Sequence, residues 1–286
     1  MIAKIIAPLT GAKRDRVVLE TAFVAARPTN AHVVALYVNA DPRLAMPYMG
    51  APLSPDVIQS IIDATAEISR GAAKMARAAL MEATAAAGVQ FESAPQRASA
   101  VTCSFLEMEG FFPHCVAEAA RLSDLIVFGP VSPADGPDLS DAFVETLMKT
   151  ERPVLLASIA PQSLTGSVML AWDGSAVAAR ALMGALPFLD EARKITLLSC
   201  HRPGARTLHF EDVQEYLSLR GHNCTVETID PGKHGVGEAL LQAAKSGRAD
   251  LLVMGGYGHS QMGEVFFGGV TQHMRWHVEL PILMVH

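Results

Sequence analysis

Long hydrophobic runs are missing from this chain, although half of its 286 residues are hydrophobic. No apolar stretch reaches the roughly 18–20 uninterrupted residues that a membrane span needs, so the hydrophobic residues are predicted to lie in a buried sheet. The first residues, Met1 to Ile6, read as a strand and lack the layout of a signal peptide. We therefore expect a cytoplasmic protein with no membrane partner.

Cysteine and charge are also scarce. The four cysteines, at positions 103, 115, 200 and 224, include no CxxC pair, and their spacing suits no common zinc site. This pattern predicts reduced thiols and no metal site. Charged residues make up 18% of the chain and the net charge is −6, which argues against a surface that binds nucleic acid.

An internal repeat is present instead. Residues 4–11 resemble residues 167–174, and two further apolar segments of the first part recur near the C-terminal end. Short apolar strands alternate with amphipathic helices in both copies, which is typical of a parallel α/β sheet. We predict two tandem doubly wound domains, residues 1–160 and 165–286, each with a five-stranded parallel sheet flanked by helices.

The expected elements follow from the same pattern. In the first copy we predict strands near residues 3–9, 32–38, 89–94, 124–128 and 153–157. In the second copy we predict strands near residues 167–172, 194–200, 224–229, 250–254 and 281–285. The first copy carries about 37 additional residues. We assign them to an inserted loop at about 40–56 and a long helix, which either pack on their own domain or form a flap or partner surface.

Three features of the second copy are expected to meet at the carboxyl edge of its sheet, where such sheets bind ligands. Asp173 follows the first strand and can accept hydrogen bonds from a ribose hydroxyl or an adenine amine; alternatively it caps the next helix, which Ser175 could do instead. Cys200 ends the second strand. After the fourth strand, Gly255-x2-Gly258-x9-Gly268 leads to a helix N-terminus, where amides and the helix dipole favour phosphate.

This glycine loop differs from the two best-known phosphate loops. It has no Gly-Lys-Ser/Thr, and its glycines follow the fourth strand rather than the first. Without a P-loop lysine, the pattern predicts binding without fast phosphoryl transfer. His259 lies within the loop and is either a phosphate contact or a solvated residue.

Asp173-Gly-Ser, the glycine spacing and the final Pro-Ile-Leu-Met-Val together resemble the universal stress protein family, and the repeat resembles its tandem type. The resemblance implies the adenine nucleotide alpha hydrolase-like fold, with the last strand of each copy joining the two into an intramolecular pseudo-dimer. It also implies ATP, ADP or AMP across the first and fourth strands, with any Mg²⁺ bound through the phosphates. The predicted nucleotide-binding residues are Ala171, Trp172, Asp173, Cys200, Met254, Gly255, Gly258, His259, Gly268, Gly269, Val270 and Thr271.

One residue departs from the family pattern. Ser or Thr usually follows the last glycine of the loop, where this chain has Gly269. The change removes a hydroxyl donor worth about 1 kcal/mol. Thr271 lies two residues further on and could replace it.

The first copy departs further. Thr10 stands where the second copy has Asp173, and Pro130, Pro133 and Pro137 remove amide donors from the equivalent loop. Asp135 and Asp138 add charge that would repel phosphate. We predict that the first copy is degenerate and binds no ATP.

The pattern as a whole predicts a nucleotide-responsive stress or signalling module without catalytic residues. A scaffold that binds no nucleotide and uses the 40–56 loop for partners is one alternative, and Gly269 favours it. A slow ATPase is the other, limited to weak hydrolysis. A homodimer of tandem chains is also compatible with the family resemblance, and no protein partner is identified.

Overall fold

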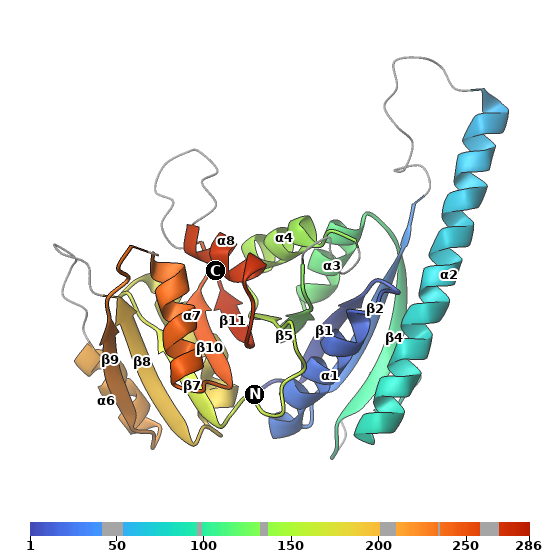
Figure 1. Ribbon diagram of the computed structural model, residues 1–286. Coiled ribbons are helices and arrows are strands. Elements are labelled where there is room, and N and C mark those ends of the chain that lie inside the picture. The colour runs from blue at the N-terminus through green and yellow to red at the C-terminus, as the bar shows by residue number, and fades with distance from the viewer. Residues whose placement is uncertain (42–53, 96–98, 132–136, 201–209, 234, 258–268) are drawn as a thin grey trace.

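The computed structural model describes residues 1–41, 54–95, 99–131, 137–200, 210–233, 235–257 and 269–286. Within them, eleven strands form one sheet in the order β3-β4-β2-β1-β5-β6-β11-β10-β7-β8-β9, with helices on both faces (Figure 1). Every neighbouring pair is parallel except β6 and β11, which are antiparallel. No helix in the described ranges has the length and apolar character needed to cross a bilayer.

Each half of the chain supplies one half of this sheet. The first half contains β1 (Lys4–Leu9), α1 (Asp15–Ala26), η1 (Arg27–Thr29), β2 (His32–Ala40), α2 (Pro55–Ala87), β3 (Gln90–Phe91), β4 (Thr102–Gly110), α3 (Phe112–Ala120), β5 (Leu125–Phe128), α4 (Ser140–Thr150) and β6 (Val154–Leu156). The second half contains β7 (Ser167–Ala171), α5 (Ala176–Leu189), β8 (Lys194–Cys200), α6 (Phe210–Leu219), β9 (Cys224–Ile229), α7 (Val236–Ser246), β10 (Leu251–Gly255), α8 (Gly269–Trp276) and β11 (Ile282–Val285).

The last strands of the two halves form the junction between them. Leu155 lies opposite Leu283 in the antiparallel pair, and both strands are completely buried. This confirms the predicted α/β fold and the expected contact between last strands. Because the pair is antiparallel, the carboxyl ends of the parallel strands lie at opposite edges of the sheet in the two halves.

The predicted sheet of the first copy was wrong by one strand. The segment expected near 89–94 forms only the two-residue β3, and the nine-residue β4, which was not predicted, lies between β3 and β2. Only the first three residues of β4 are buried, and Glu107 is exposed. The strand therefore shows neither an apolar run nor a regular alternation. The five strands predicted for the second copy are confirmed.

Hydrophobic clusters cover both faces of the sheet. Helices α1, α2, α5 and α6 pack on one face, and α3, α4, α7 and α8 pack on the other. Within β1, Ile5 and Leu9 join the first cluster and Ile6 joins the second. Strands buried on both faces read as nearly continuous apolar runs, which explains why most of them could be predicted.

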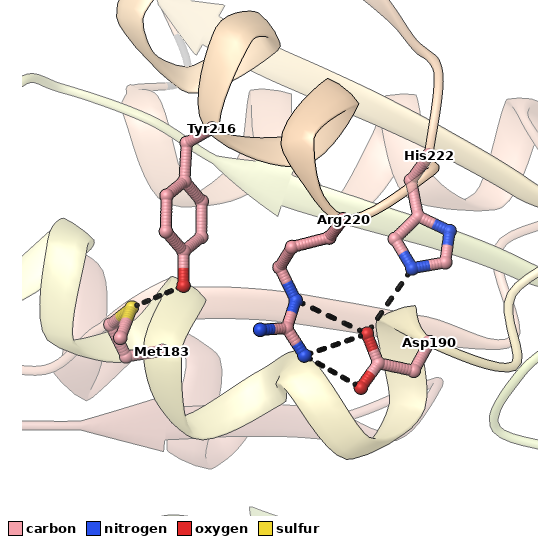
Figure 2. A network of polar contacts seen from close by, with 5 residues as sticks. All are labelled: Met183, Asp190, Tyr216, Arg220 and His222. Carbon is pink, nitrogen blue, oxygen red and sulfur yellow. Dashed lines mark hydrogen bonds and ion pairs between the residues drawn. The ribbon is translucent and has the colours of Figure 1, made fainter.

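A polar network connects the C-terminal ends of α5 and α6 (Figure 2). Arg220 donates through Nη2 to Asp190 Oδ2 at 2.9 Å, and a ring nitrogen of His222 lies 3.2 Å from Asp190 Oδ1. Burial acts to raise the pKa of Asp190, but the hydrogen bonds from Arg220 and His222 outweigh it and lower the pKa. Tyr216 donates to the sulfur of Met183 at 3.2 Å. The network orients α6, which has few buried residues of its own.

A buried histidine links the unpredicted strand to its neighbour. His32 of β2 is 5% exposed, and its Nδ1 and Nε2 lie 2.7 Å from Thr102 Oγ1 and 2.8 Å from Ser104 Oγ, both on β4. Burial is the main cause that lowers the pKa of His32; Lys4 lowers it further and Glu92 opposes this. The two side-chain contacts help to fix the register of β4.

We expect His32 to make the fold less stable in mild acid. Its folded-state pKa lies below the ordinary value of 6.5, so the unfolded chain binds the proton more readily. The stabilising contribution is fully present above pH 6.5 and decreases as the pH falls through the folded pKa. Urea unfolding between pH 8 and pH 5 would measure this, with His32→Gln expected to show a smaller decrease. An identical decrease in the variant would contradict the assignment.

Candidate functional site

The second half of the sheet contains a point at which the strand order reverses. After β7 the chain forms β8 on one side and later forms β10 on the other side of β7. Parallel α/β sheets bind ligands at the carboxyl ends of the strands that flank such a point. The predicted residues that follow β7 and β10 therefore lie at a favourable position.

Asp173 lies exposed at this edge, two residues beyond β7. Its Oδ1 accepts a hydrogen bond from the N–H of Ser175 at 3.0 Å. Ser175 is the N-cap of α5, with φ −80° and ψ 158°, and its hydroxyl oxygen accepts from the N–H of Ala178 at 3.1 Å. The alternative that Asp173 caps this helix is thus resolved in favour of Ser175, and the Asp173 carboxylate stands outside the helix.

The three residues predicted around the base divide between the faces of the sheet. Ala171 and Cys200, both half-buried, pack with the cluster under α7 and α8. Trp172 packs with the cluster under α5 and α6, and its backbone N–H donates to Leu198 O at 2.8 Å. Its indole N–H is buried without a hydrogen-bond partner in the described part of the chain. The structure therefore brings Ala171 and Cys200 together and directs Trp172 elsewhere.

Gly255 ends β10 against the first turn of α5. A Cβ at this position would lie 2.9 Å from Val177 Cγ1 and 3.1 Å from the backbone nitrogen of Ala178. The preceding Met254 is buried in the sheet. Glycine is required here because it lets the strand end approach the helix that begins beside Asp173.

Thr271 fixes the turn that follows β10. It is 3% exposed, and its hydroxyl oxygen accepts a hydrogen bond from the N–H of Tyr257 at 3.2 Å. Tyr257 has φ 57°, which is uncommon for a residue other than glycine. The Thr271 oxygen thus holds the start of α8 against the end of β10. Its predicted contact with phosphate would have to share that oxygen with the Tyr257 amide.

Gly269 begins α8 and is exposed, and a Cβ built on it would meet no atom of the described residues within 4 Å. Val270 is half-buried beside it. Three other predicted residues, Gly258, His259 and Gly268, lie outside the described residues. Their predicted roles rest on the sequence pattern.

The equivalent edge of the first half is filled by the chain itself. Asp15, in α1, is completely buried, and its carboxylate accepts hydrogen bonds from Thr10 N at 2.9 Å, Thr10 Oγ1 at 3.1 Å and Gly11 N at 2.7 Å. Burial raises the pKa of Asp15, and these hydrogen bonds partly oppose the rise. A carboxylate of the chain therefore occupies the turn after β1.

An arginine closes the other side of this turn. Arg14 is 3% exposed, and its Nη1 donates to the carbonyl oxygen of Pro130, which follows β5. Arg14 and Asp15 were not predicted as part of this edge. The only signal was an Arg-Asp pair at the start of a helix, which usually indicates a solvent-facing first turn.

The sequence reasoning also missed Arg275 in α8 and Phe143 in α4. Their contact connects the edge of the second half to the first half. Nη1 of Arg275, in α8, lies 3.4 Å from the Tyr257 hydroxyl, and its guanidinium lies 5.5 Å from the ring centroid of Phe143 in α4. Arg275 is 7% exposed. A charged residue in a short amphipathic helix gives no sequence signal of such burial.

Comparisons with known proteins concern the family resemblance and the fold. The model of the universal stress protein family matches residues 220–286. No curated protein matched the chain. A universal stress protein from Archaeoglobus fulgidus DSM 4304 is 16% identical with a TM-score of 0.69, over 99% of this chain and 97% of that one. A putative universal stress protein from Pseudomonas aeruginosa UCBPP-PA14 is 14% identical with a TM-score of 0.57, over 99% and 93% of the two chains.

At identities this low, the structural similarity establishes a shared fold and nothing more. The family match adds a sequence signature over β9 to β11. The chain therefore carries the signature of the universal stress protein family at its C-terminal end and the fold of solved universal stress proteins over its whole length, which confirms the resemblance stated from the sequence.

Proposed function

We propose that this chain binds an adenine nucleotide at the carboxyl edge of β7 and β10 and acts as a nucleotide-responsive module. The observation that carries the proposal is the position of Asp173, exposed at the strand-order reversal while Ser175 caps α5. A carboxylate in this position can accept hydrogen bonds from ribose hydroxyls or from the adenine amine. Ala171 and Cys200 would lie against the base.

The phosphates would lie toward the N-terminus of α8. Gly269 supports this placement because it is exposed and no atom of the described part of the chain lies within 4 Å of where its Cβ would stand. Backbone N–H groups at the first turn of a helix favour anions. The nucleotide would bring any Mg²⁺ on its phosphates. The chain's own residues would bind and orient the ligand, and the proposal assigns none of them a catalytic role.

We further propose that residues 1–160 and 165–286 are two domains of this type and that only the second binds nucleotide. The buried Asp15 carboxylate and the Arg14 guanidinium support this, because they occupy the turn in the first half that corresponds to the Asp173 edge. A phosphate there would face a carboxylate of the chain. The first domain would then serve as the structural partner across β6 and β11.

Replacing Asp173 by alanine is expected to weaken ATP binding by about 10- to 100-fold, since about 1.4 kcal/mol corresponds to each factor of ten. Isothermal titration of the purified chain with ATP and magnesium would measure this. Glu191→Ala is the matched control, because Glu191 is also exposed but precedes β8, at the opposite edge of the same half. Equal affinities for Asp173→Ala and the control would contradict the proposed site.

A second variant separates the nucleotide site from the scaffold alternative. Gly269→Ser restores the hydroxyl that the family pattern has, without a steric clash with the residues that the structure describes, and should strengthen binding by about fivefold for a net hydrogen bond of about 1 kcal/mol. Absence of binding in both the unaltered chain and Gly269→Ser would favour the scaffold. Hydrolysis of ATP by the unaltered chain that Asp173→Ala abolished would favour the ATPase.

A further inference from the structure

The long helix α2 carries a largely exposed apolar stripe on a different side from the residues that pack on its own core. The stripe, called the α2 seam below, alternates spacings of four and three residues. It consists of Val57, Ile61, Ala64, Ile68, Gly71, Met75 and Ala78. Ile68 is 74% exposed and Met75 is 61% exposed. The residues that anchor α2 to the first half, including Ala76, Leu80 and Ala83, lie on a different side of the helix and are buried.

The spacing and the position of α2 distinguish this stripe from scattered exposed residues. Alternating steps of four and three give the average period of 3.5 residues that two paired helices need to bury a shared stripe. A lone exposed leucine would require no explanation. Figure 1 shows α2 at the outer end of the sheet, with its N-terminal part reaching beyond the strands.

We propose that the α2 seam is a dimer interface and that its occupant is the α2 seam of a second copy of this chain, in antiparallel orientation. Side-chain sizes are self-complementary in this arrangement. Large residues of one helix face small residues of the other: Ile68 faces Gly71 of the second copy, and Ile61 faces Ala78. Gly71 has no atom of the described residues within 4 Å of where a Cβ would stand, so the described structure leaves the space beside it open to a partner side chain.

Charge along the helix selects the antiparallel orientation. Asp56, Asp63 and Glu67 precede the centre of α2, Arg70, Lys74 and Arg77 lie at or after it, and Glu82 is the one acidic residue that follows them in the helix. In the proposed register, Glu67 flanks the seam opposite Lys74 of the second copy, and the two-fold axis generates this pair twice. A parallel pairing would place the acidic halves beside each other.

The length of the seam sets the expected affinity. In the proposed register the two seams overlap from Ile61 to Ala78, which spans about 26 Å of helix at about 1.5 Å per residue and is a small interface compared with standard ones. We therefore expect a dissociation constant on the order of 1–100 μM. This dimer is independent of nucleotide binding, because the seam lies in the first half and the proposed nucleotide site lies in the second.

Sedimentation equilibrium of the full chain from about 1 to 200 μM, a range that brackets the expected constant, should show a monomer–dimer equilibrium. Ile68→Glu places a charge in the centre of the seam and should raise the dissociation constant at least about tenfold, as expected for a central interface residue. Leu122→Glu is the matched control, because Leu122 is 82% exposed outside α2, and it should leave the equilibrium unchanged. A chain that is monomeric throughout, or a dimer that Ile68→Glu leaves intact, would overturn the proposal.

Charge exchange tests the orientation separately. Glu67→Lys and Lys74→Glu should each weaken the dimer, because each places like charges opposite one another, and the double exchange should restore it. Weakening that the double exchange does not reverse would overturn the antiparallel register. A monomer whose α2 seam instead binds lipid vesicles of neutral phosphatidylcholine, in a manner abolished by Ile68→Glu, would assign the surface to a membrane and also overturn the proposal.

Discussion

Gly11→Ala is expected to lower the free energy of unfolding by about 2–5 kcal/mol, through two separate effects. Gly11 follows β1 with φ 78°, in the left-handed region, where a Cβ costs about 1–2 kcal/mol. The same Cβ would lie 2.5 Å from the carbonyl oxygen of Ala72 and 2.8 Å from its Cα, both backbone atoms of α2. Moving a packed helix to relieve such an overlap costs a further 1–3 kcal/mol or so.

The matched control is Gly88→Ala. Gly88 is the C-cap of α2 and has φ 66°, but a Cβ there would meet no atom within 4 Å. This variant should therefore show only the conformational cost, about 1–2 kcal/mol. Denaturant unfolding of the three proteins would give the difference. Equal losses for Gly11→Ala and Gly88→Ala would show that α2 does not press against the turn after β1.

The contact between Gly11 and Ala72 bears on function because it belongs to the filled edge of the first half. Asp15 fixes the turn through Thr10 and Gly11, and α2 closes over Gly11. The same edge in the second half has Asp173 exposed instead. The longer helix of the first half, 33 residues in α2 against 10 in α6, thus accounts for part of the asymmetry between the two halves.

Strands buried on both faces could be predicted, and so could the largely exposed edge strand β9, whereas the partly exposed β4 could not. Apolar runs identified β1, β5 and β10 because both of their faces are covered by helices. The missed β4 pairs with β2 along its whole length. Only its first three residues are buried, and the other six are half-buried or exposed. Its stability comes from backbone pairing and from the His32 contacts, which leave no periodic pattern in the sequence.

The candidate site was predictable to a similar extent. The position of Asp173 after β7 followed from the repeat, but only the backbone geometry of Ser175 showed which residue caps α5. The filling of the first-half edge depends on Asp15, which lies five residues beyond Thr10 and returns to it through the first turn of a helix. A position-by-position comparison of the two copies aligns Thr10 with Asp173. It cannot show that the carboxylate of Asp15, from α1, lies in the turn beside Thr10.

The two halves also contact each other through α8, which begins at the proposed phosphate site. Gly269 starts this helix, and Arg275 in its last turn packs on Phe143 of the first half. A ligand that changed the position of α8 would therefore change a buried contact with α4. If ligand binding in the second half affects the first half through α8, the effect depends on the energy of the contact between Arg275 and Phe143.

Phe143→Ala is expected to lower the free energy of unfolding by about 3–5 kcal/mol, the usual cost of removing a buried phenylalanine. Phe143 is completely buried, and its ring packs edge-on against Phe128 at a centroid distance of 5.7 Å. Phe111→Ala, at a residue that is 55% exposed before α3, is the matched control and should change stability by about 0.5 kcal/mol or less.

Part of the loss in Phe143→Ala should depend on Arg275. A buried guanidinium against an aromatic face contributes about 1–2 kcal/mol, so a double-mutant cycle of Phe143→Leu with Arg275→Met should show a coupling of roughly that size. Denaturant unfolding of the four proteins measures it. Additive effects would mean that α4 and α8 pack independently, and would contradict a route from Gly269 to the first half through Arg275.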